Sequence, residues 1–210
     1  DSLSDYEKNE EIQKIEVEIN LSFNNFDFVC SNIDEKLKKY KSNLYWKKIQ
    51  IFCQILNDEI NKANLGLSLI KEDENFNDDH FLSILDNLIY KEDIDGSQFQ
   101  DINLLNLAMT RIGKITLSDV TSFNDDPLFL SMLYGMPNVS IETRITALEK
   151  SQKLISIPKN TIEEIYNSYE VKGNEMKFPL DNEFVDLGPA TQAILYQRAI
   201  KEDSNENKAK

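Results

Sequence analysis

The chain reads FDFVCSNIDEKLKKYKSNLYWKKIQIFCQIL over residues 26–56, and the apolar spacing of this stretch indicates the fold class. From Phe26 to Tyr40, apolar residues fall at offsets 0, 3, 4, 7, 11 and 14, which is the spacing of one face of an α-helix. From Tyr45 to Leu56, they fall at offsets 0, 4, 7, 8 and 11 and predict a second helix. Because only a short polar break separates the two, the stretch predicts an antiparallel helical hairpin.

Helical stripes recur along the rest of the chain. The sequence contains only 6 Gly and 5 Pro, and so few turn-forming residues favour helices over a many-turned β-fold. We therefore predict an all-α fold in which about nine short helices pair in antiparallel hairpins and form an α–α superhelix or irregular helical-repeat array. The predicted helices cover residues 26–40, 45–56, 60–70, 81–89, 102–112, 128–136, 141–148, 161–169 and 189–202.

The two ends lack a helical stripe. In the N-terminal arm, residues 1–27, four apolar residues from Ile15 to Leu21 alternate with polar ones. This period of two predicts an extended arm or one strand laid on the helices, and a partly ordered terminus is the alternative. The helical-repeat domain then covers residues 28–202, with a looser link over 171–187. Residues 203–210 contain nothing apolar enough to fold and are predicted to be disordered.

Composition excludes some classes of function. Lys and Arg total 23 against 37 Asp and Glu, so the formal net charge of the 210-residue chain is −14. An acidic chain repels phosphates, which disfavours nucleic acid as a partner. No apolar run approaches the ~18 residues of a membrane span, and no membrane-spanning segment is predicted.

No motif predicts a reaction, a cofactor or a metal site. His80 is the single histidine, and it lies beside Asp78 and Asp79, where a helix is predicted to begin. A catalytic zinc site needs about three protein ligands, so the ordinary first-turn position explains His80 better. The clustered carboxylates, such as those at 72–74 and 92–95, lie in polar loops where neither member of a catalytic pair would be desolvated. We therefore do not expect an enzyme.

The two cysteines have a defined geometry within the predicted hairpin. Cys30 and Cys53 lie at equal distances from the predicted turn, so they reach the same height on antiparallel helices. Both also belong to the inward stripes, which would let their β-carbons approach the ~4 Å that a disulfide requires. A disulfide implies an oxidising compartment such as the bacterial periplasm. The alternative is two buried free thiols, which would agree with the cytoplasm.

Part of the chain resembles a known group of proteins. The stretch from Tyr45 to Leu69, which contains WKKIQIFCQIL and ANLGL, resembles uncharacterised helical-repeat proteins of alphaproteobacteria. The segments 126–129, 144–149 and 192–199 are similar to the same proteins. This resemblance implies an exported protein that is longer than this chain. More loosely, the arrangement resembles the α-superhelical scaffold of soluble lytic transglycosylases, although the lysozyme-like catalytic domain of those enzymes has no counterpart here.

The function that follows is a non-catalytic scaffold or protein-binding module of the bacterial cell envelope, since stacked helix pairs offer extended surfaces. Its acidic charge would favour a basic protein partner. The alternative is the non-catalytic scaffold of a peptidoglycan-processing enzyme. A small-ligand site would require a pocket of ~300 Å³ or more. Aromatic residues often anchor interfaces, although each of those in this chain also suits the core. The candidates are Tyr45, Trp46, Tyr134, Tyr166, Tyr169 and Tyr196.

Overall fold

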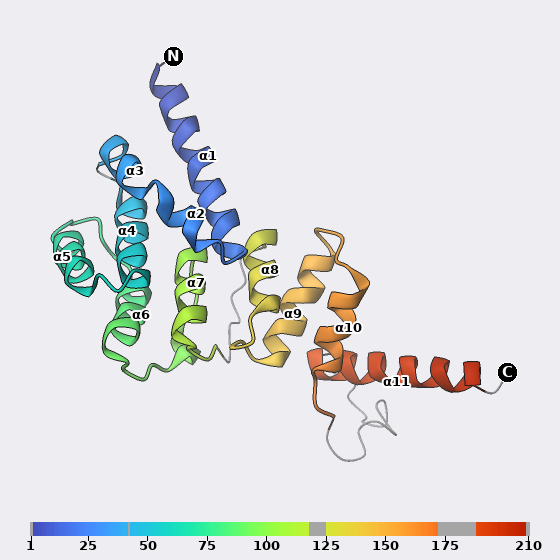
Figure 1. Cartoon of the computed structure of the whole chain (residues 1–210). Coiled ribbons are helices and arrows are strands. Elements are labelled where there is room, and N and C mark those ends of the chain that lie inside the picture. Colours follow the sequence, from blue (N-terminus) through green and yellow to red (C-terminus); the bar gives the residue numbers. More distant parts are fainter. Residues whose placement is uncertain (1, 42, 118–124, 172–187, 209–210) are drawn as a thin grey trace. The chain divides into compact units, whose positions relative to one another are not determined.

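The computed structural model describes residues 2–41, 43–117, 125–171 and 188–208. Over these ranges it contains eleven α-helices, one short 3₁₀ helix and an isolated bridge between Leu117 and Val139 (Figure 1). The predicted all-α class is therefore confirmed, and the helix pairs are compatible with the predicted helical array. The chain divides into two compact units, Asp1–Thr116 and Leu117–Lys210, where the sequence predicted one domain over 28–202.

The first unit is built from seven α-helices. The hairpin of α4 and α5 is its most extensive helix pair, and α6 packs on α7. The 3₁₀ helix η1 (Gly96–Gln98) lies in the connection between α6 and α7. The bounds of the helices are α1 (Ser2–Ser22), α2 (Phe26–Ser31), α3 (Ile33–Lys39), α4 (Leu44–Leu56), α5 (Ile60–Lys71), α6 (Asp79–Tyr90) and α7 (Leu104–Gly113).

The predicted hairpin is present, but its first helix is broken. Asn32 takes a non-helical conformation, with φ −127° and ψ 26°, and it separates α2 from α3. The single helix predicted over 26–40 is therefore two short ones. The turn that follows joins α3 to α4, and the Asn43 side chain begins α4 by accepting a hydrogen bond from the Tyr45 N–H. Both α2 and α3 contact α4, as a hairpin requires.

The prediction of an extended N-terminal arm over 1–27 is wrong, because the structure has the helix α1 there. The apolar residues 15, 17, 19 and 21 that suggested a strand are also two pairs spaced four apart. Val17 and Leu21 are fully buried on one face of α1, whereas Ile15 and Ile19 are exposed on the other. Residues spaced four apart share one face of a helix, so two interleaved pairs imitate the alternation of a strand. Packing against α2 and α7 accounts for the helical outcome.

The core of the first unit gathers where α1 and α4 meet the other helices. Trp46, Ile49 and Phe52 of α4 are fully buried, as is Val29 of α2. Phe26 packs its ring edge-on against Phe52, with 5.5 Å between centroids. Burial of these large side chains supplies the main stabilising free energy of the unit.

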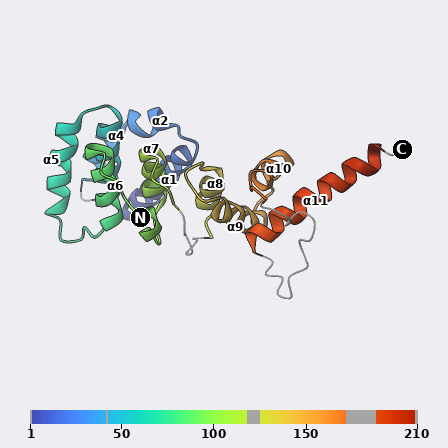
Figure 2. The ribbon, with the colours of Figure 1, turned by 90° about the horizontal axis from the view of Figure 1, so that it is seen from below.

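The second unit is a smaller helical group. Its elements are α8 (Pro127–Gly135), α9 (Ile141–Gln152), α10 (Lys159–Asn167) and α11 (Pro189–Lys208). α9 contacts each of the other three, and α11 extends past α10 toward the C terminus (Figure 2). Buried side chains from α9, α10 and α11 form its core: Ile145, Leu148, Ile165, Tyr166 and Ala193.

The helix ends of this unit test several sequence predictions. The helix predicted over 128–136 is confirmed as α8: Asp126 accepts a hydrogen bond from the Leu128 N–H, and Pro127 occupies the first helical position, where its missing N–H costs nothing. The helix predicted over 161–169 begins two residues earlier than expected, because α10 starts at Lys159 after Pro158 and ends at Asn167. The disordered tail predicted over 203–210 is wrong for residues 203–208, where α11 continues. Residues 209–210, and all but residue 171 of the predicted link over 171–187, lie outside the described ranges.

Candidate functional site

The disulfide predicted from the hairpin register is present. Cys30 in α2 and Cys53 in α4 are bonded, with their α-carbons 5.6 Å apart. The bond fastens the short helix α2 to the core helix α4. Cys53 is buried, and both cysteines are among the residues that line a pocket of about 280 Å³, together with Asp34 and Lys62.

Of the predicted interface aromatics in the first unit, Trp46 lies inside the protein. Its side chain is fully buried, and its indole N–H donates a 2.9 Å hydrogen bond to Glu10 Oε1 of α1. Tyr40 stacks on the indole and Tyr45 meets it edge-on, with centroids 5.8 and 5.0 Å away. Lys36 Nζ lies 5.1 Å from the centre of the same ring. Trp46 therefore holds α1, α3 and α4 together, and its assignment to an interface is wrong.

The tyrosines predicted for the second unit also serve packing. Tyr166 and Tyr196 stack with 4.8 Å between centroids, and Tyr166 donates a hydrogen bond to Glu149 Oε1 at 3.0 Å. Burial, reinforced by the nearby Glu149 carboxylate, raises the pKa of Tyr166 well above the ordinary range. Tyr134, Tyr169 and Tyr196 are half-buried against this core. The structure therefore brings these four tyrosines to one core and does not gather them on an exposed patch.

Among the residues that the structure describes, the longest row of exposed apolar side chains lies along α1, and a shorter pair, Leu65 and Leu69, lies on α5. We call the row on α1 the outer face of α1; it consists of Ile12, Ile15, Ile19 and Phe23. Their side chains are 66%, 47%, 38% and 76% exposed. Phe23 directly follows the helix, and its N–H still bonds to the Ile19 carbonyl at 3.2 Å. Their spacing of 0, 3, 7 and 11 is the sequence signal of this face, although the period of two over residues 15–21 favoured an extended arm instead.

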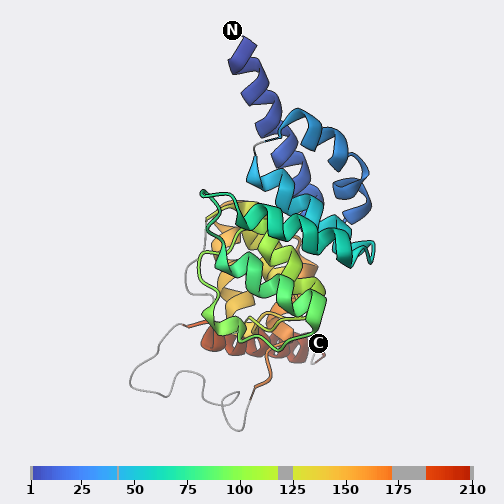
Figure 3. The ribbon, with the colours of Figure 1, turned by 90° about the vertical axis from the view of Figure 1, so that its left-hand side faces the viewer.

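The opposite side of α1 faces the unit. Val17 and Leu21 are buried there, and Glu10 accepts hydrogen bonds from Trp46 and from Asn43 Nδ2. Figure 3 shows the N-terminal part of α1 extending beyond α2 and α3. One side of the helix thus completes the core while the outer face meets solvent.

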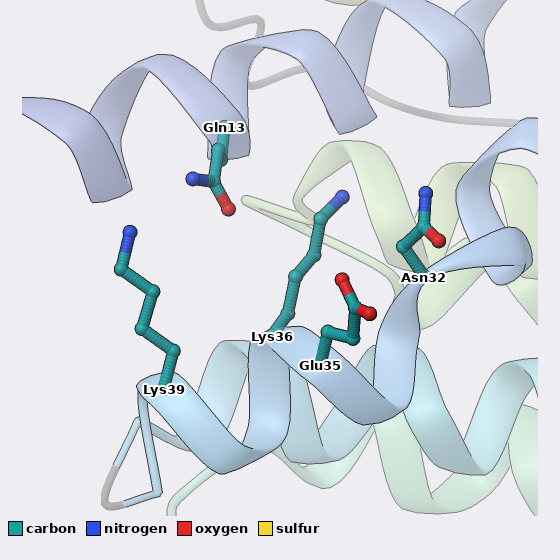
Figure 4. Close-up of a pocket in the computed structure, with 5 residues that line it drawn as sticks. All are labelled: Gln13, Asn32, Glu35, Lys36 and Lys39. Atoms are coloured by element: carbon teal, nitrogen blue, oxygen red, sulfur yellow. The ribbon is translucent and has the colours of Figure 1, made fainter.

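A polar cleft of about 310 Å³ lies between α1 and α3, lined by Gln13, Asn32, Glu35, Lys36 and Lys39 (Figure 4). In this view Gln13 points into the cleft from α1, and Lys36 and Lys39 extend from α3 toward α1. Burial lowers the pKa of Lys36, and the charge of Glu16 acts in the opposite direction. The cleft reaches the size of a small-ligand site, but its lining is charged, whereas such sites are mostly apolar.

A second polar cluster, which the sequence did not indicate, ties α4 to α6 and α7. Lys48 Nζ lies 2.6 Å from Asp78 Oδ2, and both side chains are largely buried. Asp78 Oδ1 accepts hydrogen bonds from the Phe81 N–H at 2.9 Å and from Asn106 Nδ2 at 3.1 Å. Burial alone would raise the pKa of Asp78, but Lys48 and the Phe81 N–H outweigh it, and the pKa lies below its usual value.

We expect Lys48→Met to lower the free energy of unfolding at pH 7 by about 2 kcal/mol, because Asp78 then keeps its charge without its cationic partner. Since the pKa of folded Asp78 is lowered, its contribution is complete above the unfolded value of about 3.9 and is lost as the pH falls further. The difference in unfolding free energy between wild type and variant should therefore shrink as the pH falls below about 4. Urea unfolding followed by circular dichroism at several pH values measures this, and a difference that grows on acidification would contradict it.

His80 occupies the predicted first turn of α6. Its Nε2 lies 2.8 Å from the Gln100 carbonyl oxygen, and its ring meets Phe99 edge-on at 5.1 Å. These contacts tie the start of α6 to the connection before α7. Among the residues that the structure describes, no group of three or more His, Cys, Asp or Glu side chains is placed to hold a metal ion.

Comparison of the chain with protein-family models, curated proteins and solved structures finds no match. The resemblance to alphaproteobacterial helical-repeat proteins therefore stays a prediction. In the described part of the chain, the outer face of α1 has more exposed apolar side chains than the pair on α5, and packing within the protein does not explain them.

Proposed function

We propose that this chain is a non-catalytic helical module that binds a protein partner through the outer face of α1, in the envelope of a bacterium. The observation that carries the proposal is the exposure of Ile12, Ile15, Ile19 and Phe23 on one side of a helix whose other side is buried. Single exposed apolar residues are normal, but a row of four along one helix is typical of interaction surfaces.

The disulfide supports the proposed compartment. Disulfides persist in oxidising environments such as the periplasm and are rare in the cytosol. The Cys30–Cys53 bond therefore favours an exported protein. In the described part of the chain, no helix combines the length and the apolar character needed to cross a bilayer.

A photo-reactive amino acid placed at residue 12 tests the proposal in cells of the native host. We expect it to cross-link a different protein, which mass spectrometry can identify. Leu65 on α5 is the matched control, because its 63% exposure is close to the 66% of Ile12. The cross-link should be absent from position 65 and lost when Ile19→Asp is added.

Equal cross-linking from positions 12 and 65 would contradict a specific surface on α1. The alternative function, a scaffold for a peptidoglycan-processing enzyme, makes a different prediction. Co-sedimentation of the chain with purified peptidoglycan, unchanged by Ile19→Asp, would favour that alternative.

A further inference from the structure

The outer face of α1 has the spacing of a coiled-coil seam. Ile12, Ile15 and Ile19 stand at successive a, d and a positions of a heptad, with Phe23 one position past the next d. Residues 13, 17 and 21, which fall at the b, f and c positions behind the seam, face the first unit. From residue 12 to residue 23 the seam is about 17 Å long, which three turns of a second helix would cover.

Acidic side chains flank this seam. Glu11 stands at a g position and Glu16 at the following e position, and both are exposed. In a coiled coil these positions face the partner helix and set partner choice through charge.

A second copy of the chain is a poor partner for this seam. In a parallel pair of identical helices, Glu11 of one copy would face Glu16 of the other, and an antiparallel pair would also set like charges together. The net charge of −14 adds a general repulsion between copies. A helix that carries Lys or Arg at its own e and g positions would place opposite charges beside both glutamates.

We propose that the outer face of α1 binds a basic amphipathic helix of another protein, with Ile12, Ile15, Ile19 and Phe23 packing against its apolar face and Glu11 and Glu16 pairing with its cationic flanks. The inference rests on the proposed function and names the class of partner. Four apolar side chains make a small interface, so the complex is a reversible one, with a dissociation constant of about 10 μM.

Two synthetic peptides test the charge preference on the full chain. Both carry Leu at a and d and Gln or Ala at b, c and f; one carries Lys at e and g, and the other carries Glu. Isothermal titration calorimetry should show the basic peptide binding at least about tenfold more tightly than the acidic one at low salt. Raising the salt concentration should reduce the difference in affinity between the two peptides, since the ion pairs of Glu11 and Glu16 with the peptide are exposed to solvent.

Two double variants test the location. Ile12→Asp/Ile19→Asp should weaken basic-peptide binding by about tenfold or more, whereas Leu65→Asp/Leu69→Asp on the exposed side of α5 should leave it unchanged. Glu11→Lys/Glu16→Lys should reverse the preference toward the acidic peptide. Glu72→Lys/Glu74→Lys, in the exposed loop after α5, changes the net charge equally and should not reverse it. Circular dichroism confirms that each variant folds.

If both peptides bind equally well, or if neither binds, the partner is not a basic helix and this inference is wrong. The proposed protein-binding function is tested separately, and a specific cross-link from position 12 would still support it. Sedimentation velocity tests the competing occupant. Self-association that Ile12→Asp/Ile19→Asp abolishes would identify a second copy as the partner and overturn the inference.

Discussion

Replacement of Trp46 by alanine is expected to lower the free energy of unfolding by about 4 kcal/mol. The indole is fully buried, and its N–H is bonded to Glu10. Alanine would leave a large cavity where α1, α3 and α4 meet, because the indole volume is removed. Tyr40 and Tyr45 would also lose the ring against which they pack. Urea unfolding followed by far-ultraviolet circular dichroism measures the change.

Two further variants give this prediction its controls. Trp46→Phe keeps most of the buried apolar area but removes the N–H donor to Glu10, so we expect a loss of about 1–2 kcal/mol. Tyr90→Ala removes an aromatic side chain that is 59% exposed, and we expect a loss of at most about 0.5 kcal/mol. If Trp46→Ala costs no more than Tyr90→Ala, the indole does not hold α1 on the unit.

Reduction of the Cys30–Cys53 bond is the second large effect, with an expected loss of about 3 kcal/mol. The bonded residues are 23 positions apart, and reduction restores to the unfolded chain the conformations that this loop excluded. The fluorescence of Trp46 reports the unfolding of the first unit in urea, with and without a reducing agent. The midpoint of the unfolding transition should move to a lower urea concentration when the disulfide is reduced.

The double variant Cys30→Ala/Cys53→Ala is the control for this experiment, because a reducing agent should no longer move its midpoint. Peptide mass spectrometry of non-reduced protein from the native host completes the test. We expect one linked peptide that contains Cys30 and Cys53. Two free thiols in that sample would remove the support for an oxidising compartment.

The disulfide could be predicted from the sequence because it depends on local regularities. Two helical stripes and one short break set the height of each cysteine on its helix, whatever the other helices do. The pairing of Cys30 with Cys53 is as predicted even though Asn32 divides the first helix into α2 and α3. The caps that Asp126 and Asp78 form are local in the same way, since a cap involves only neighbouring backbone N–H groups.

The candidate site could not be predicted, because it depends on which side of α1 the other helices cover. Residues 15, 17, 19 and 21 fit a strand and a two-faced helix equally well in a single sequence. In the folded chain, α2 and α7 pack on α1 and bury Val17 and Leu21, and the outer face is what remains. The same limit applies to Trp46, whose large apolar surface suits an interface or a core.

Local patterns in the sequence were enough to predict the all-α class and the hairpin register with its cysteine pair, because helical periodicity and turn spacing act over a few residues. The acidic charge follows directly from the composition. Packing between helices was needed to make the N-terminal segment helical, to place Trp46 inside the protein and to pair Lys48 with Asp78. Each of these outcomes includes contacts between residues about 30 or more positions apart along the chain, which no local pattern records: α1 with α7, Trp46 with Glu10, and Lys48 with Asp78. These contacts also leave the outer face of α1 exposed, and this is the outcome that bears on function.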